Sequence, residues 1–346
     1  MTSRRTPRTA AASRTTARIT GPLELLQAVP YLLGFRPWAS LVLVGLRESG
    51  LVVTARTDLG DVERDTGLLG TTLRSVARAD ATAVVGAVFD DAGPEQPAGF
   101  ADHTLLAARM QAAADAADVA VLDVLQVAGG RWRSALCTDP ACCPADGEPL
   151  PATTPPFVAA ATVDGIAPLA DRAAFAECLA PAPDAERAAL EPAIATAESA
   201  AVQAVLDARE RAHRRAAVRA LFSAARASDR LRWSPPAADE SAGLAVALTD
   251  VPVRDSVWMG VDDRRLDGRA LWLHLARHLP SPYDAPPLFL YAWAEWRAGN
   301  GAAASMAAHR ALDSDPSYTA ADLLVAALAH GVDPRRLPRL RLPRTA

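Results

Sequence analysis

SLVLVGLRESGLVVTARTD, residues 40–58, contains two β-rich runs, Leu41–Leu46 and Leu51–Thr57, on either side of the polar tetrapeptide Arg47-Glu48-Ser49-Gly50. Gly50 supplies the freedom for positive φ that a tight reversal often needs, so the stretch predicts a β-hairpin. The first run is apolar throughout, which is typical of a strand buried on both faces. We therefore expect the N-terminal part of the chain to be built around this hairpin.

Helix and strand patterns alternate after the hairpin. Strands that are linked through helices run parallel. The pattern therefore predicts an α/β domain over residues 19–165, with a mixed, largely parallel sheet and flanking helices. Its predicted elements are helices over 22–35, 61–79 and 102–117, strands over 83–89 and 119–127, a turn at Gly129-Gly130 and a returning strand over 131–137.

From residue 166 onward the composition predicts an all-α region, 166–346, with a proline- and arginine-rich tail from about residue 334. Residues 184–228 predict one very long helix or two. Further on, small residues and a proline fall at the spacing of a single tetratricopeptide-like helix pair, whereas arrays of such repeats need about three units. We predict a helical hairpin packed on a larger body, with a peptide-binding groove as the alternative. The spacing is carried by Ala292, Gly299, Ala304, Ala308, Ala311 and Pro316.

Composition excludes several classes of protein. The chain has 346 residues, 50% of them hydrophobic and 22% charged, which is typical of a globular protein. Its net charge of −4 gives no overall attraction to nucleic acid or to an anionic membrane, and no apolar run is long enough to cross a membrane. Residues 1–18 carry arginines without an apolar core, so we expect a disordered basic tail rather than a secretory signal. Four cysteines at this length favour a reducing cytoplasm over a disulfide scaffold.

Three blocks of sequence carry a resemblance to a known family. They are LELLQAVPYLLGFRPWASLVLVGL at 23–46, GRWRSALCTDPACCPADGEPLP at 130–151 and AWAEWRAGNGAAASMAAHRALDSDPSY at 292–318. In this order they are similar to the uncharacterised actinobacterial family called domain of unknown function 4192, over nearly the whole chain after residue 18. The resemblance implies one continuous family unit and a bacterial cytoplasmic protein. It implies no activity, cofactor or catalytic residue.

Polar residues gather at one predicted edge of the sheet. The carboxyl ends of parallel strands share an edge, and the first hairpin strand, being antiparallel, would begin there. Ligands of open α/β sheets bind outside these strand ends. Ordinary turn chemistry is the alternative interpretation. Because clustered carboxylates repel, at least one should pair with an arginine or await a cation. The predicted ligand-binding residues are Arg36, Ser40, Arg56, Asp58, Asp90, Asp91 and Arg131.

The cysteines form a second cluster, Cys137, Cys142 and Cys143, with Cys178 further along the chain. Zinc ligands usually come in pairs spaced C-x₂₋₄-C. Here the spacing is C-x₄-C-C, and adjacent cysteines rarely point at the same ion. We expect structural thiols at the end of the sheet opposite the carboxylates. Metal binding and a redox or disulfide role are the alternatives.

Two patterns in the helical region can be interpreted either as structural or as functional. His274 and His278 lie four residues apart on a predicted helix without the glutamate of a zinc protease, so we interpret them as surface or interhelix histidines. Five arginines fall on one side of another predicted helix and could contact phosphates, although Glu210 and Asp229 dilute their charge. We interpret this stripe, Arg211, Arg215, Arg219, Arg226 and Arg230, as a solvated face.

The chain contains no P-loop, dinucleotide-binding or nucleophile-elbow motif. The function predicted from sequence is therefore a non-catalytic cytoplasmic protein that binds a small ligand or a protein partner in a regulatory role. The first alternative is an enzyme with a carboxylate-lined site, in which Mg²⁺ would be bound by carboxylate oxygens and substrate phosphates. The second is a nucleic-acid-associated protein that uses the arginine stripe.

Overall fold

The computed structural model describes residues 19–48, 50–93, 99–151, 155, 158–159, 167–230 and 233–340. The chain forms two compact units. The first ends at Phe175 and also includes Asn300–Ala302 and Ala327–Asp333; the second comprises Ala176–Gly299, Ala303–Ala326 and the chain from Pro334. The predicted basic tail, residues 1–18, lies outside the described residues. The predicted domain boundary at residues 165–166 also lies outside them and stays a prediction.

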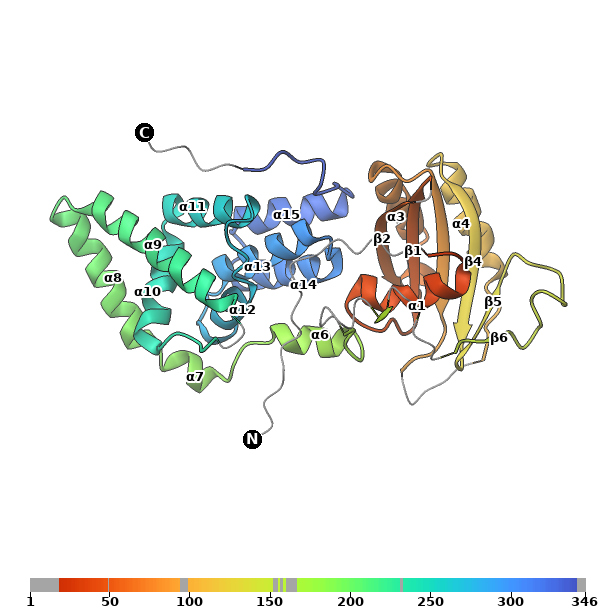
Figure 1. The fold of residues 1–346 in the computed structure, drawn as a ribbon, viewed down its shortest axis with the longest axis horizontal. Coiled ribbons are helices and arrows are strands. Elements are labelled where there is room, and N and C mark those ends of the chain that lie inside the picture. The colour runs from red at the N-terminus through yellow and green to blue at the C-terminus, as the bar shows by residue number, and fades with distance from the viewer. Residues whose placement is uncertain are drawn as a thin grey trace. The chain divides into compact units, whose positions relative to one another are not determined.

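The first unit is built on a six-stranded mixed sheet with the order β2-β1-β3-β4-β5-β6 (Figure 1). Within the described part of the chain, β3 and β4 are the one parallel pair, and the other neighbouring strands pair antiparallel. The expectation of a largely parallel sheet is therefore wrong, because β1 lies between β2 and β3 and separates two strands that run in the same direction. The strands are β1 Ser40–Arg47, β2 Gly50–Asp58, β3 Ala83–Phe89, β4 Ala120–Ala128, β5 Arg131–Ser134 and β6 Glu148–Pro149.

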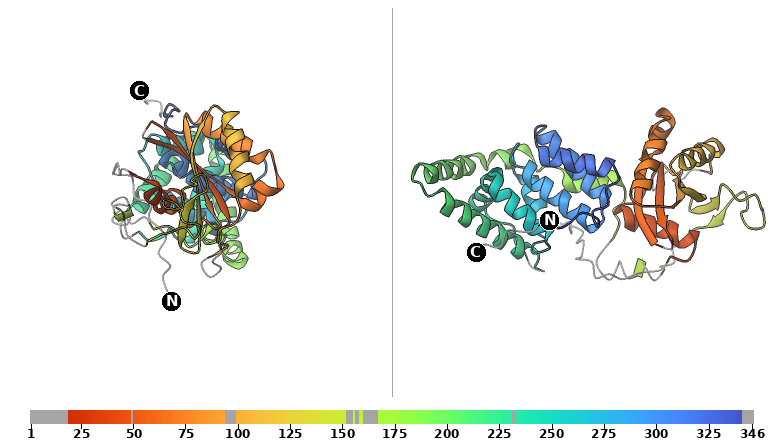
Figure 2. Two further views of the ribbon diagram at one scale, coloured as in Figure 1. Left: turned by 90° about the vertical axis from the view of Figure 1, so that its right-hand side faces the viewer. Right: turned by 90° about the horizontal axis from the view of Figure 1, so that it is seen from above.

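Helices cover both faces of this sheet (Figures 1 and 2). Helix α1, Pro22–Leu33, lies on one face, and α2, Leu59–Arg64, α3, Leu68–Arg78, and α4, Thr104–Asp115, lie on the other. The predicted helix over 61–79 is divided into α2 and α3 because Asp65 leaves the helical conformation. Its carboxylate accepts the Gly67 N–H at 2.8 Å, and such a local bond competes with the helix.

Two glycines allow the helices to approach the sheet closely. A Cβ atom on Gly45 of β1 would lie 2.6 Å from Val53 Cγ1 and 2.9 Å from Val76 Cγ1. A Cβ atom on Gly86 of β3 would lie 2.7 Å from the sulfur of Met110. Distances this short are not tolerated in a packed interior. The close packing of α3 and α4 on the sheet therefore requires glycine, which has no side chain, at these two positions.

The second unit is helical, as predicted. The stretch 184–228 contains three helices rather than one or two, and the break before the last of them coincides with positive φ at Ala208. No helix in the described ranges is both long and apolar enough to span a membrane. The helices are α6 Arg172–Leu179, which begins in the first unit, then α7 Asp184–Ala188, α8 Glu191–Leu206, α9 Glu210–Ser228, α10 Ala238–Thr249, α11 Val251–Asp262, α12 Arg269–His278, α13 Ala285–Ala298, α14 Gly301–Ser314 and α15 Thr319–Ala329.

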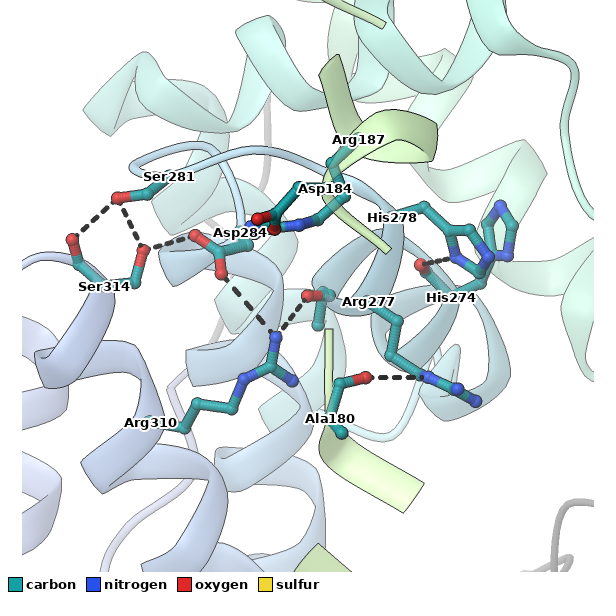
Figure 3. A network of polar contacts seen from close by, with 11 residues as sticks. Ala180, Asp184, Arg187, His274, Arg277, His278, Ser281, Asp284, Arg310 and Ser314 are labelled. Atoms are coloured by element: carbon teal, nitrogen blue, oxygen red, sulfur yellow. Dashed lines mark hydrogen bonds and ion pairs between the residues drawn. The ribbon is translucent and has the colours of Figure 1, made fainter. Parts of the chain in front are cut away.

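A polar network joins three helix ends inside the helical unit (Figure 3). Arg310 of α14 donates to the carbonyl oxygen of Ala276 in α12 at 3.0 Å and lies 3.8 Å from the carboxylate of Asp284, which precedes α13. Ser314 donates to the same carboxylate, and Ser281 donates to the Ser314 carbonyl at 2.8 Å. Burial raises the pKa of Asp284 and lowers that of Arg310. This network ties α12, α13 and α14 together and is structural in character.

Candidate functional site

The strand pairing brings the predicted edge residues to one end of the sheet. Ser40, the first residue of β1, is the register partner of Asp58 at the end of β2 and of Phe89 at the end of β3. Asp90 follows Phe89 directly, so Asp58 and Asp90 share this end. Asp91 lies there too, because both of its carboxylate oxygens accept the N–H of Gly129, at 2.9 and 3.2 Å, in the turn after β4.

Arg56 links β1 to β2 at this end of the sheet. Its guanidinium group donates two hydrogen bonds to the Ser40 hydroxyl, at 3.0 and 2.8 Å, and two to the Asp58 carboxylate, at 2.9 and 2.5 Å. Ser40 in turn donates to the Trp38 carbonyl at 2.5 Å. A bidentate arginine–carboxylate pair is strong and geometrically specific. The Asp58 charge is thus compensated within the sheet itself.

Asp90 pairs with a histidine that sequence reasoning missed. One carboxylate oxygen of Asp90 lies 2.5 Å from Nε2 of His103, and both side chains are almost fully buried, 4% and 10% exposed. The other oxygen, Oδ2, is buried and has no partner among the described residues. A local signal was present in Asp102, which accepts hydrogen bonds from the hydroxyl and the N–H of Thr104, at 2.6 and 3.0 Å, at the start of α4. The hydroxyl bond, followed by the N–H bond, lowers the pKa of Asp102, and together they hold the backbone next to His103.

The other two predicted arginines do not join the carboxylates. The Arg131 guanidinium donates to the backbone oxygens of Asp146 and Gly147, at 2.6 and 2.5 Å, and so anchors the loop that returns to β6. Arg36 is exposed and forms no ion pair within the described ranges. Of Asp58, Asp90 and Asp91, only Asp90 has an oxygen without a hydrogen-bond partner in the described part of the chain. Mg²⁺ is bound by several oxygen ligands, so these contacts do not favour a magnesium centre.

A basic groove lies on α9 in the helical unit. Its volume is about 380 Å³, and it is lined by Val218, Arg219, Phe222, Ser223, Arg226 and Arg230. The three arginines are exposed and form no ion pair with any described residue. The guanidinium carbon of Arg226 lies 5.7 Å from the centre of the Phe222 ring, a cation–π contact that holds this charge above an apolar floor.

The acidic residues near this groove are engaged elsewhere. Glu210 pairs with Arg214 at 2.8 Å, and Asp229 accepts the N–H of Gly268 at 2.9 Å. Burial raises the pKa of Asp229 above its ordinary value. The expectation that these two acids dilute the charge of the arginine stripe stays a prediction. Glu210 thus pairs within α9 itself, Asp229 bonds to the residue before α12, and neither forms an ion pair with Arg219, Arg226 or Arg230 among the described residues.

His274 and His278 pack against each other on α12, and the ring centres are 4.3 Å apart (Figure 3). Nδ1 of His278 lies 2.8 Å from the His274 carbonyl oxygen, which fixes the second ring. Burial, followed by the charges of His278 and Arg277, lowers the pKa of His274 to about 4. His274 is therefore neutral at physiological pH, and the pair has the surroundings of a packed interhelix contact.

The fold and these contacts define a two-unit protein: an α/β unit whose sheet end is closed by internal pairs, and a helical unit with an exposed basic groove. The chain belongs to the family described as domain of unknown function (DUF4192), whose model matches residues 22–335. No curated protein and no solved structure matches it significantly.

Proposed function

We propose that the protein is a non-catalytic binding protein whose helical unit binds an acidic segment of a partner protein through the basic groove on α9. The observation that carries the proposal is the set of three uncompensated guanidinium groups, Arg219, Arg226 and Arg230, around the apolar side chains of Val218 and Phe222. Arginine is suited to this task because its planar group donates two parallel hydrogen bonds to one carboxylate.

The mixed character of the groove favours an acidic peptide over nucleic acid. A peptide can place carboxylates on the arginines and an apolar side chain on Val218 and Phe222 together, whereas a nucleic acid must unstack a base to cover Phe222 while its phosphates meet the arginines. The whole chain carries a net charge of −4, which repels a long polyanion but matters little to a short segment held within a Debye length of the groove. The enzyme and nucleic-acid alternatives stay predictions.

The test is a fluorescence-anisotropy titration of the full chain with a labelled peptide of about twelve residues in which glutamate and leucine alternate. The variant Arg219→Gln/Arg226→Gln/Arg230→Gln should lose at least ~tenfold in affinity, or about 1.4 kcal/mol. Binding to the unmodified chain should also weaken as salt is added, because exposed charges are screened.

A matched control removes the same charge elsewhere. Arg36→Gln/Arg74→Gln/Arg78→Gln changes three arginines of the first unit and should bind the peptide as the unmodified chain does. Equal losses in both triple variants would mean that net charge alone governs binding. Absence of peptide binding, or stronger binding of a labelled single-stranded oligonucleotide through the same groove arginines, would overturn the proposal.

Two finer features belong with this proposal. We infer that α13 and α14 form the tetratricopeptide-like helix pair, which is supported by the complete burial of Ala292, Ala304, Ala308 and Ala311, since small residues permit close helix packing. We also infer a reducing, cytoplasmic setting, which is supported by four cysteines that are all free thiols.

A further inference from the structure

Three thiols converge in the loop that follows β5. The Sγ atoms of Cys137, Cys142 and Cys143 all lie within 4.8 Å of one another, with Cys142 exposed and the other two partly buried. The adjacent residues Cys142 and Cys143 point toward the same place, contrary to the expectation from their spacing. The reason is a tight turn, in which the N–H groups of both residues donate to the carbonyl oxygen of Asp139, at 3.1 and 2.8 Å.

The loop is held in this shape from both sides. At its start, the Ser134 hydroxyl accepts the N–H of Cys137 at 3.1 Å, and the Asp139 carboxylate accepts the N–H of Ala141 at 2.9 Å. At its end, Arg133 donates to the carbonyl oxygen of Ala145 at 3.0 Å, alongside the contacts that Arg131 makes with the same segment. Little conformational freedom is left to lose when a ligand binds, which favours affinity.

We propose that Cys137, Cys142 and Cys143 form a three-thiolate binding site for a soft d¹⁰ cation, for which Zn²⁺ is the test ion. Zinc–sulfur bonds of about 2.3 Å place thiolates about 3.8–4.0 Å apart, so sulfur atoms already within 4.8 Å of one another need to move by less than ~1 Å. Thiolates select cations of this class over magnesium or calcium.

Three protein ligands leave one position of a tetrahedral site open. Structural zinc sites are closed by four protein ligands, whereas an open position takes water or another exchangeable ligand. Cys142 is exposed, so the open position faces solvent. The site therefore has the character of one that exchanges its metal or an outer ligand, rather than one that holds the fold together.

Binding is coupled to proton release. A thiol binds a metal ion as the thiolate, so each of the three side chains must give up its proton. When the cation binds, each S–H bond breaks, a metal–sulfur bond replaces it and the proton passes to solvent; up to three protons leave, and no electron is transferred. Affinity should accordingly increase with pH.

The experiment titrates the full chain, reduced and kept free of oxygen, with Zn²⁺ in competition with a chromophoric chelator. We expect one equivalent to bind, with release of protons, and expect Co²⁺ to give an intense thiolate-to-cobalt absorption. Cys142→Ser should weaken binding by at least ~tenfold while far-ultraviolet circular dichroism stays unchanged. Cys178→Ser, which changes the one cysteine outside the cluster, should bind as the unmodified chain does.

Alkylation provides a second measurement that does not depend on the variants. Bound Zn²⁺ should protect Cys137, Cys142 and Cys143 from iodoacetamide, as read by peptide mass spectrometry, and leave the labelling of Cys178 unaltered. Failure of the reduced chain to bind one equivalent, unchanged affinity in Cys142→Ser, or protection confined to Cys178 would each overturn the proposal.

Discussion

His274 should make the stability of the helical unit depend on pH. Its pKa is lowered from 6.5 to about 4, first by burial and then by the charges of His278 and Arg277. The Trp233 ring packs edge-on against it, with ring centres 5.9 Å apart. Between about pH 6.5 and about pH 4 the unfolded chain therefore binds a proton that the folded chain does not. Stability from this residue is fully present above pH 6.5 and is lost as the pH falls toward 4.

The size of this effect follows from the pKa shift. One pKa unit corresponds to about 1.4 kcal/mol, so the shift to about 4 sets an upper value of about 3 kcal/mol. Because the ring is partly exposed, solvent screens part of this energy, and we expect about 2 kcal/mol. In the unmodified chain alone, the acid-induced change in the free energy of unfolding includes the titration of every other group, so the contribution of His274 has to be isolated with a variant.

The assay compares variants by urea unfolding, followed by far-ultraviolet circular dichroism, at about pH 7.5 and about pH 4.5. His274→Gln should reduce the acid-induced loss in the free energy of unfolding by about 2 kcal/mol relative to the unmodified chain. His309→Gln, which changes an exposed histidine of α14, should leave that loss unchanged. An identical acid-induced loss in His274→Gln and in the unmodified chain would refute the reasoning.

Two matched pairs of substitutions test packing and ion pairing by urea unfolding. Gly45→Ala should cost about 2–3 kcal/mol because its neighbours are branched side chains that cannot withdraw, whereas Gly86→Ala should cost about 1 kcal/mol because it meets a flexible methionine; equal costs would count against this account. Arg269→Met should cost about 3 kcal/mol because it leaves the carboxylate of Glu295, 3.3 Å away and 2% exposed, without this partner. The exposed Arg64→Met should cost little, and a similar loss there would contradict the burial argument.

Local signals in the sequence placed most of the strands accurately. The observed β3 has the predicted bounds, and the hairpin strands differ from prediction by one residue at each end, because apolar runs and a glycine-containing turn are local features. Helix breaks were harder to predict. The interruption near Asp65 depends on one side chain bonding to the backbone two residues away, and helical periodicity continues through it.

The partners of the candidate site residues could be predicted only in part. Arg56 pairs with Asp58 two residues away on the same strand, which alternation along a strand makes accessible. By contrast, the two shortest Arg131 contacts are with backbone oxygens of a loop, and backbone acceptors leave no trace in residue types; its ion pair with Asp146, at 3.3 Å, lies in the same loop. His103 lies 13 residues from Asp90, and their contact depends on where α4 begins relative to β3.

Strand order explains why the predicted edge forms closed pairs. A ligand crevice arises in open α/β sheets where the strand order reverses, since the crossover helices then lie on opposite faces. Here the helical crossovers lead from β2 to β3 and from β3 to β4, always in the same direction across the sheet, and their helices α2, α3 and α4 pack on one face. No reversal separates these strands. Ser40 at the start of β1 instead occupies the space between the ends of β2 and β3, and Arg56 bonds to it. The order depends on pairing between distant segments, which residue patterns do not encode. Once the strand order is known, the arginines of α9 that form no ion pair among the described residues are better supported as a ligand-binding site than the paired residues at the sheet end.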